Sequence, residues 1–224
     1  MDKRESYSSR DLVAGYDGRR FGGRSGAWVN SRELETVYSL IPEDGLLLDF
    51  PCGTGRLSRF LKEKKLTIIG ADYSPAMLQS AKKERTIPLV RADMSSIPFI
   101  EAAFNCVVSM RFVFHYKMIE PIFQGVKRIL KKDGIYIFDT FNWSPRAGGL
   151  WGDRRVFIHP KREIRMLLAK VGMEIVEERS CFFFSPVLYR SLPLTLVKFL
   201  ERLEESAPAW LLVRVFWKVR KTGR

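Results

Sequence analysis

The chain has 224 residues, 46% of them hydrophobic, and carries a formal net charge of +13. This length suits a single domain, and the hydrophobic content excludes a disordered protein. The three cysteines, Cys52, Cys106 and Cys181, are too few and too scattered for a disulfide framework or a metal site, which fits a reducing, cytoplasmic location. The N-terminus has no apolar run typical of a signal peptide, and no stretch approaches the roughly 20 apolar residues of a transmembrane helix.

Basic residues cluster near positions 19–24, 127–132, 154–165 and 214–224. Such clusters are compatible with peripheral contact with an anionic membrane or a nucleic acid, and equally with a solvated basic surface. The chain has no zinc-finger spacing and no basic segment with interleaved aromatics of the kind that stacks on RNA. Nothing in the sequence indicates an obligate protein partner.

The first 41 residues predict an N-terminal lid followed by a helix. Residues 1–30 are polar, glycine-rich and basic, with a mobile loop expected at 22–26. Ser31 can cap a helix that runs to about residue 40, because Leu34, Val37 and Tyr38 recur at helical spacing.

Three short apolar runs follow, and each ends in an acidic residue: Asp49, Asp72 and Asp93. Helices predicted at 55–64 and from Ser74 to about residue 83 separate the runs, which indicates parallel strands with crossover helices. Ligands of such sheets bind outside the carboxyl ends of the strands. The three carboxylates therefore predict a site for a nucleoside-bearing cofactor.

The second half of the chain continues the alternation of strands and helices. We expect a strand at 104–109, a helix at 118–131, a strand at 135–140, a loop at 142–158, a helix at 160–170, a strand at 173–183 and a helix at 192–205. Residues 213–220 approximate a period of two, which favours a last, antiparallel strand over a helix. The expected fold is a single Rossmann-like α/β domain at 1–224, with a seven-stranded, mostly parallel sheet and a helical insertion before the last strand. Its cofactor-binding core spans 45–141 and its acceptor side 142–224.

The turn after the first strand contains Gly53 and Gly55, which let the backbone approach a ligand closely. The helix that follows directs its free N–H groups to the same place. A dinucleotide fingerprint is poorly met, because Ser58 occupies the position of its third glycine. A P-loop is excluded, because no Gly-Lys-Ser/Thr follows.

With these motifs in place, the chain resembles the class I S-adenosylmethionine-dependent methyltransferases, and within them the small-molecule branch that includes the ubiquinone- and menaquinone-biosynthesis-like enzymes. Residues 47–55 are similar to the first motif of this family, 71–78 to the second and 91–99 to the third. Residues 104–109 match its fourth strand, and 128–134 match the turn into its fifth strand. Pro51 departs from the pattern, since many members carry glycine there.

The resemblance implies S-adenosylmethionine as the cofactor and assigns binding roles to matching positions. Asp72 would accept hydrogen bonds from the ribose hydroxyls, and Asp93 from the adenine amine, with a backbone contact from Met94. The full set of implied cofactor residues is Asp49, Pro51, Cys52, Gly53, Gly55, Asp72, Tyr73, Met77, Asp93, Met94, Ser109 and Met110. For Tyr73 and Met77, ordinary helix packing is an equally good explanation, and Cys52 is expected to be structural.

The family resemblance also implies a function: transfer of a methyl group to a small, apolar or aromatic acceptor such as a quinone, a phenol or a lipid-like molecule. Tyr16, Arg111 and His115 are the polar residues expected in the acceptor pocket, and His115 is the candidate general base, with packing as its alternative role. The aromatic residues 182–184 and the helix at 192–205 would wall this pocket or form plain core. No metal is expected. RNA or protein methylation, a non-catalytic cofactor-binding protein and a membrane-binding module stay open as alternatives.

Overall fold

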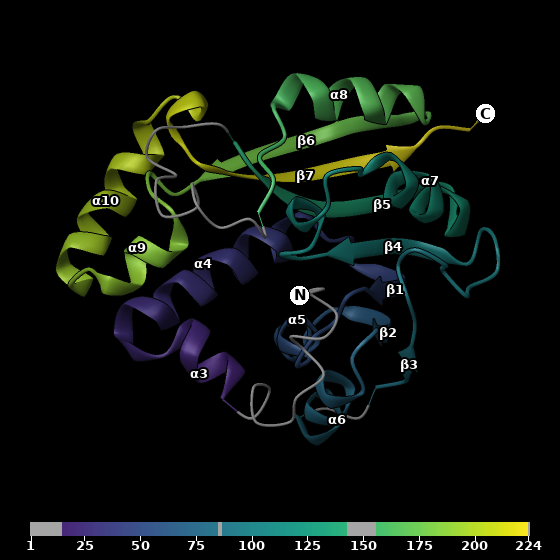
Figure 1. The fold of residues 1–224 in the computed structure, drawn as a ribbon, viewed down its shortest axis with the longest axis horizontal. Helices are drawn as coiled ribbons and strands as arrows, with labels where there is room; N and C mark the ends of the chain where they lie inside the picture. The colour runs from purple at the N-terminus through teal and green to yellow at the C-terminus, as the bar shows by residue number, and fades with distance from the viewer. Residues whose placement is uncertain (1–14, 85–86, 143–155, 224) are drawn as a thin grey trace.

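The structure, a computed structural model, describes residues 15–84, 87–142 and 156–223. Its seven strands form one sheet in the order β3-β2-β1-β4-β5-β7-β6 (Figure 1). The strands are β1 (Asp44–Asp49), β2 (Lys65–Asp72), β3 (Leu89–Arg91), β4 (Phe104–Ser109), β5 (Leu130–Phe141), β6 (Met173–Cys181) and β7 (Arg214–Lys221). The predicted seven-stranded α/β sheet is thereby confirmed.

The first five strands are parallel, and β7 runs antiparallel between β5 and β6. The strand alternative for the tail is thus the correct one. Its period of two places Val215 and Trp217 against one face of the sheet and Phe216 against the other, all of them fully buried. Trp217 is paired with Phe138 of β5, and the two rings stack with centroids 6.2 Å apart.

Helices cover both faces of the sheet (Figure 1). Residues of α7 and α8 pack in one core cluster, and residues of α4 and α5 pack in the other. The α-helices described are α3 (Tyr16–Phe21), α4 (Gly23–Leu40), α5 (Arg56–Phe60), α6 (Pro75–Glu84), α7 (Glu120–Ile129), α8 (Lys161–Lys170), α9 (Pro186–Ser191) and α10 (Leu194–Ser206). In the described ranges, no helix is both long and apolar enough to cross a membrane.

The boundaries of α5 and β5 differ from the sequence expectation. Helix α5 is shorter than predicted, and β5 begins at Leu130, five residues before the predicted strand. The pairing of β4 with β5 jumps from Leu130 to Ile135, so the intervening turn residues, with Asp133 at φ 58°, form an irregularity inside the strand. The predicted loop at 142–158 lies mostly outside the described residues.

The loop expected at 22–26 is wrong, because α4 already begins at Gly23. The early start follows from packing: Ser25 and Gly26 are buried, and Ser25 Oγ donates a hydrogen bond to the carbonyl of Leu192 at 2.7 Å. A Cβ on Gly26 would lie 2.7 Å from the backbone of Phe21. Glycine there allows α3 and α4 to approach each other closely.

The helical insertion before the last strand, α9 and α10, packs against α4 rather than against the sheet edge alone. Trp28 of α4 stacks on Tyr189 of α9 with ring centroids 5.5 Å apart. Tyr189 in turn donates a hydrogen bond to the buried Glu204 of α10 at 2.6 Å. The insertion therefore supports the N-terminal helices.

Candidate functional site

A cavity of about 480 Å³ lies at the carboxyl ends of the parallel strands. Its walls come from α3, from the turns after β1 to β3, and from the segment after β4. The lining residues are Tyr16, Asp17, Phe21, Asp49, Phe50, Pro51, Cys52, Gly53, Thr54, Arg56, Leu57, Asp72, Tyr73, Ser74, Met77, Ala92, Asp93, Met94, Met110, Arg111, Phe112, His115 and Tyr116. The ligands of open parallel sheets bind at this edge, outside the carboxyl ends of the strands.

One side of the cavity is acidic, because β1, β2 and β3 each deliver a carboxylate to it. Asp72 Oδ2 accepts a hydrogen bond from Gly53 N and its Oδ1 from Ser74 N, both at 2.9 Å. Asp93 Oδ1 accepts from the backbone N–H and hydroxyl of Ser95. These bonds fix both carboxylates where their strands end, as the sequence predicted.

The turn after β1 brings backbone close to the cavity. Gly53 has φ 55° and Gly55 has φ 77°, left-handed values that a glycine adopts without strain. Pro51, joined to Phe50 by a cis peptide, and Cys52 also line the wall. Burial raises the pKa of the Cys52 thiol, and Asp49 and Asp72 raise it further, so Cys52 stays protonated and is no nucleophile.

All the residues predicted to bind the cofactor line this cavity except Gly55 and Ser109. Gly55 sits one step behind the wall, where it precedes α5 and where an added Cβ would lie 3.2 Å from Ala81. The Ser109 hydroxyl donates to the carbonyl of Phe50. Both residues shape the turn that lines the cavity.

The opposite side is aromatic and basic. Tyr16, Arg111 and His115, the three residues predicted for the acceptor, line it together. His115 ends the short 3-10 turn Val113–His115. Phe112 and Tyr116 flank this turn, with ring centroids 4.8 Å apart. Residues 182–205 do not line the cavity, so the prediction that they wall the acceptor pocket is wrong. The helices of this segment contact α4 instead.

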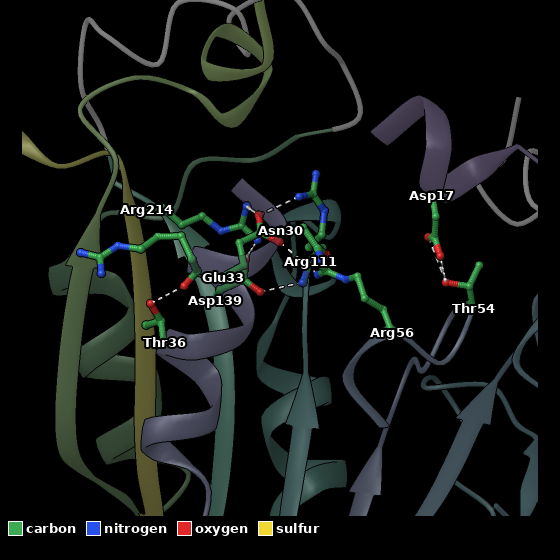
Figure 2. A network of polar contacts seen from close by, with 10 residues as sticks. Asp17, Asn30, Glu33, Thr36, Thr54, Arg56, Arg111, Asp139 and Arg214 are labelled. Carbon is green, nitrogen blue, oxygen red and sulfur yellow. Dashed lines mark hydrogen bonds and ion pairs between the residues drawn. The ribbon is translucent and has the colours of Figure 1, made fainter. Parts of the chain in front are cut away.

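A buried ionic network lies directly behind the basic side (Figure 2). Glu33 of α4 has no exposed side-chain surface, and its Oε1 accepts hydrogen bonds from Arg111 Nη1 and Arg214 Nη1, each at 2.8 Å. Its Oε2 accepts from Arg56 Nη2 at 3.0 Å. Asp139, at the end of β5, lies 2.7 Å from Arg214 Nη2 and accepts the backbone N–H of Arg111 at 2.6 Å.

The arginines keep Glu33 ionised. Burial alone would raise the pKa of Glu33, but Arg111, Arg214 and Arg56 together lower it to about 2. Burial similarly opposes the charge on Arg214, while Asp139 and Glu33 raise the pKa of Arg214. Glu33 and Arg214 are therefore both charged at neutral pH, whereas burial raises the pKa of Asp139, with Arg214 opposing that shift.

Helix α3 closes the cavity from above through contacts with two other elements. Asp17 accepts a hydrogen bond from Thr54 Oγ1 at 3.0 Å and pairs with Arg59 Nη2 at 3.1 Å. Arg190 of α9 donates to the carbonyls of Arg19 and Arg20 at 2.9 and 3.1 Å. These contacts give the predicted lid its position over the turn after β1.

Sequence reasoning missed Glu33, Arg56 and Asp17, together with the network residues Asp139 and Arg214. The signal for Glu33 was present, because it lies at helical spacing from the buried Val29 and Val37, on an otherwise apolar face. The signal for Arg56 was its place in the first turn of α5, where a cation opposes the helix dipole unless an anion compensates. Asp17 gave no such signal.

Asp49 is a buried carboxyl group of the cavity wall with a strongly raised pKa. Burial raises its pKa to about 8, with Arg56 opposing the shift and Asp72 adding to it. Its Oδ2 is buried and accepts no hydrogen bond within the described part of the chain. A buried carboxyl oxygen without a donor, facing a cavity, is suited to a cationic or hydrogen-bond-donating ligand.

Comparison with known proteins agrees with this geometry. Residues 48–138 match the family described as a methyltransferase domain. The chain is 34% identical over 112 residues to YqeM of Bacillus subtilis, which is named as a methyltransferase, covering 46% of this chain and 45% of that protein. It is 32% identical over 118 residues to a malonyl-[acyl-carrier protein] O-methyltransferase of Legionella pneumophila, covering 50% of this chain and 42% of that protein. The chain thus spans less than half the length of these curated relatives.

Solved structures share the same fold. An S-adenosylmethionine-dependent methyltransferase of Thermotoga maritima superposes with a TM-score of 0.69 at 20% identity, covering 93% of this chain and 96% of that one. Residues 48–138 thus match a methyltransferase domain, and the chain shares its fold, with an antiparallel β7, with a solved S-adenosylmethionine-dependent methyltransferase.

The network makes a first prediction, for Glu33→Gln. This change leaves three guanidinium groups around a neutral amide, and breaking a buried ion pair costs about 3–5 kcal/mol. We expect a loss of this order in the free energy of unfolding at pH 7, measured by urea denaturation. The difference from wild type should shrink as the pH falls from 4.5 towards 2, because over this range Glu33 binds a proton in the unfolded chain while native Glu33 stays ionised. Glu35→Gln, on the exposed face of α4, is the control and should change stability by about 0.5 kcal/mol or less. Equal stabilities of the two variants would contradict the network's role.

The raised pKa of Asp49 makes a second prediction, for the ligand-free protein. Between pH 4 and 8 native Asp49 holds a proton that the unfolded chain has released, so the free energy of unfolding should fall as the pH rises. Asp49→Asn removes the carboxyl group that holds this proton, so the free energy of unfolding should depend less on pH. Asp44→Asn, at the exposed start of β1, should leave the pH dependence unchanged. Urea denaturation at pH 5, 7 and 9 measures the difference. Parallel profiles for wild type and Asp49→Asn would refute the assignment.

Proposed function

We propose that the protein binds S-adenosylmethionine in this cavity and transfers its methyl group to a small acceptor with an apolar or aromatic skeleton. The observation that carries the proposal is the division of the cavity into two sides. Three carboxylates at consecutive strand ends and a glycine turn form one side, and aromatic residues form the other. The first suits a nucleoside with a cationic chain, and the second an apolar acceptor.

In this proposal the cofactor lies across the ends of β1, β2 and β3. Asp72 accepts from the ribose hydroxyls, and Asp93 accepts from the adenine amine beside the backbone of Met94. Tyr73, which is 41% exposed, and Met77, which is buried, pack on the nucleoside. Asp49 and the backbone at Gly53 face the methionine part. The positively charged amino group of the methionine part is then the partner of the buried Asp49 carboxylate.

The sulfonium is already activated, so the residues of the chain mainly orient the reactants and exclude water. An acceptor atom donates its electron pair to the methyl carbon, the carbon–sulfur bond breaks, and its electron pair stays on sulfur in S-adenosylhomocysteine. A proton lost by the acceptor passes to a base, for which His115 is the candidate at the cavity wall. In the described residues no cluster of His, Cys, Asp or Glu side chains could hold a metal ion.

The enclosure of the cavity favours a small acceptor. Helix α3 lies over it, held by Asp17 and by the contact of Arg190 with the end of α3. The name of the Legionella relative describes methyl transfer to a malonyl group carried on a protein, which is also a small acyl acceptor. A nucleic-acid substrate would instead need an open, basic groove at the methyl-bearing end.

The assignment of the ribose-binding residue gives a third prediction. Asp72→Asn replaces a charged acceptor of two hydroxyl groups with an amide, and charge-assisted hydrogen bonds contribute about 1.5–3 kcal/mol each. We expect S-adenosylhomocysteine to bind at least about tenfold more weakly by isothermal titration calorimetry. Asp93→Asn should cost less, since a single amine and a backbone contact are involved there.

Asp44→Asn, at the opposite end of β1, is the matched control and should bind like wild type. Circular dichroism of each variant checks the fold, because Asp72 also anchors the backbone of Gly53 and Ser74. Unchanged affinity in a folded Asp72→Asn protein would exclude the ribose role. Incubation of a lysate with the protein and S-adenosylmethionine should yield a small molecule heavier by one CH₂; labelling of RNA alone would overturn the acceptor class.

A further inference from the structure

Arg111 has an unused recognition edge on the acceptor side of the cavity. Its Nη1 donates to Glu33, but Nε and Nη2 have no hydrogen-bond acceptor among the residues that the structure describes. In a guanidinium group, Nε–H and one Nη–H lie on the same edge and point in parallel. This edge matches the two oxygens of a carboxylate.

The backbone holds Arg111 in place for such a role. Its φ of 55° is a left-handed value that is unfavourable for a non-glycine residue. The carboxylate of Asp139 compensates by accepting the Arg111 N–H at 2.6 Å. The side chain is therefore fixed at both ends, by Asp139 at the backbone and by Glu33 at Nη1, before any ligand arrives.

The charges around Arg111 leave a positive excess. Arg56, Arg111 and Arg214 carry three positive charges and all contact the single carboxylate of Glu33, while burial raises the pKa of the neighbouring Asp139. Burial lowers the pKa of Arg111 to about 10, Glu33 opposes this shift, and the positive charges of Arg214 and Arg20 add to it. An incoming anion would relieve the repulsion among these guanidinium groups.

The surroundings of the free edge are apolar. The ring of Phe21 lies 5.5 Å from the Arg111 guanidinium carbon, and Phe112 and Tyr116 line the same side of the cavity. Charge pairs are stronger where water is excluded. The rings also give a flat, apolar space for the carbon skeleton that carries the anion.

Arg111 lies next to the residues implied for the cofactor but is anchored beyond them. Met110, the last of those residues, precedes Arg111 directly, whereas the Arg111 backbone contacts Asp139 of β5 and its side chain contacts Glu33 of α4. In the sheet, β5 lies on the far side of β4 from β1. Because the cofactor carries a carboxylate of its own, the affinity of the Arg111 variants for S-adenosylhomocysteine has to be measured beside their affinity for the acceptor.

We propose that Arg111 binds a carboxylate of the acceptor, so that the enzyme selects small aromatic or aliphatic carboxylic acids. This inference rests on the proposed function and narrows its acceptor class. The carboxylate docks on the Nε–Nη2 edge, while the apolar part of the acceptor packs on Phe112 and Tyr116. Arg111 is then the residue that determines specificity for the acceptor.

Calorimetry with matched pairs of probes tests the proposal. The protein is saturated with S-adenosylhomocysteine and titrated with benzoate or benzamide, cinnamate or cinnamamide, and hexanoate or hexanamide. Each pair has nearly the same shape but differs in charge. We expect wild type to bind at least one carboxylate about tenfold or more tightly than its amide.

Three variants complete the experiment. Arg111→Gln should abolish the preference and stay folded, because Glu33 keeps Arg56 and Arg214 as partners. Arg111→Lys should retain only part of it, since the charge remains but the paired N–H donors are lost. Arg165→Gln, on the exposed face of α8, removes the same charge elsewhere and should keep the wild-type preference.

The outcomes separate this inference from the proposed function. Binding of S-adenosylhomocysteine with no preference in any pair, or a preference that survives in Arg111→Gln, would overturn the acceptor assignment alone. If Arg111→Gln weakened the binding of S-adenosylhomocysteine as much as the binding of the carboxylate probes, the assignment would also be overturned. Arg111 would then hold the carboxylate of the cofactor. Failure of wild type to bind S-adenosylhomocysteine would overturn both proposals.

Discussion

The burial of one carboxylate, that of Glu33, is the constraint on which the acceptor half of the molecule depends. A buried charge costs several kcal/mol unless it is fully paired, and Glu33 is paired with three guanidinium groups. Those groups come from α5, from the segment after β4 and from the start of β7. Glu33 therefore ties α4 to three separate places at the edge of the sheet and fixes the position of α4 beside the cavity wall.

The position of α4 determines the roof of the cavity. Helix α3 precedes it directly, and Phe21 at the end of α3 packs with its ring 4.3 Å from the guanidinium carbon of Arg56. The insertion α9–α10 braces the same two helices from outside, through Tyr189 on Trp28 and Arg190 on the end of α3. It shapes the site through these contacts and contributes no lining residue. The N-terminal helices thus link the ionic network, the insertion and the cavity.

The cofactor half could be predicted from the sequence because its signals are local. Asp49, Asp72 and Asp93 each end an apolar run, and the glycine turn lies within a few residues of the first, so short windows were enough to place them on one edge. The antiparallel β7 was likewise evident from its period of two. The network was not predictable in this way, because the partners of Glu33 lie 23, 78 and 181 residues away in the chain. The loop expected at 22–26 failed for the same reason: the burial of Ser25 and Gly26 depends on Leu192 and Phe21, not on local propensity.

The carboxylate side of the cavity is built from local segments, whereas the basic side depends on contacts between distant ones. The part of the chain that matches the methyltransferase family reflects this difference. The family match covers residues 48–138, which run from the end of β1 into β5 and hence contain Asp49, Asp72 and Asp93. Glu33 and Arg214 lie outside this range, as does α3. The cofactor side is thus contained in a continuous, recognisable segment, whereas the acceptor side is assembled from that segment and from elements on both sides of it. Changes in the flanking elements can therefore alter the basic, aromatic side of the cavity while the carboxylates at the strand ends stay in place. Arg111 lies where the two halves meet, within the matched segment but held by the network outside it.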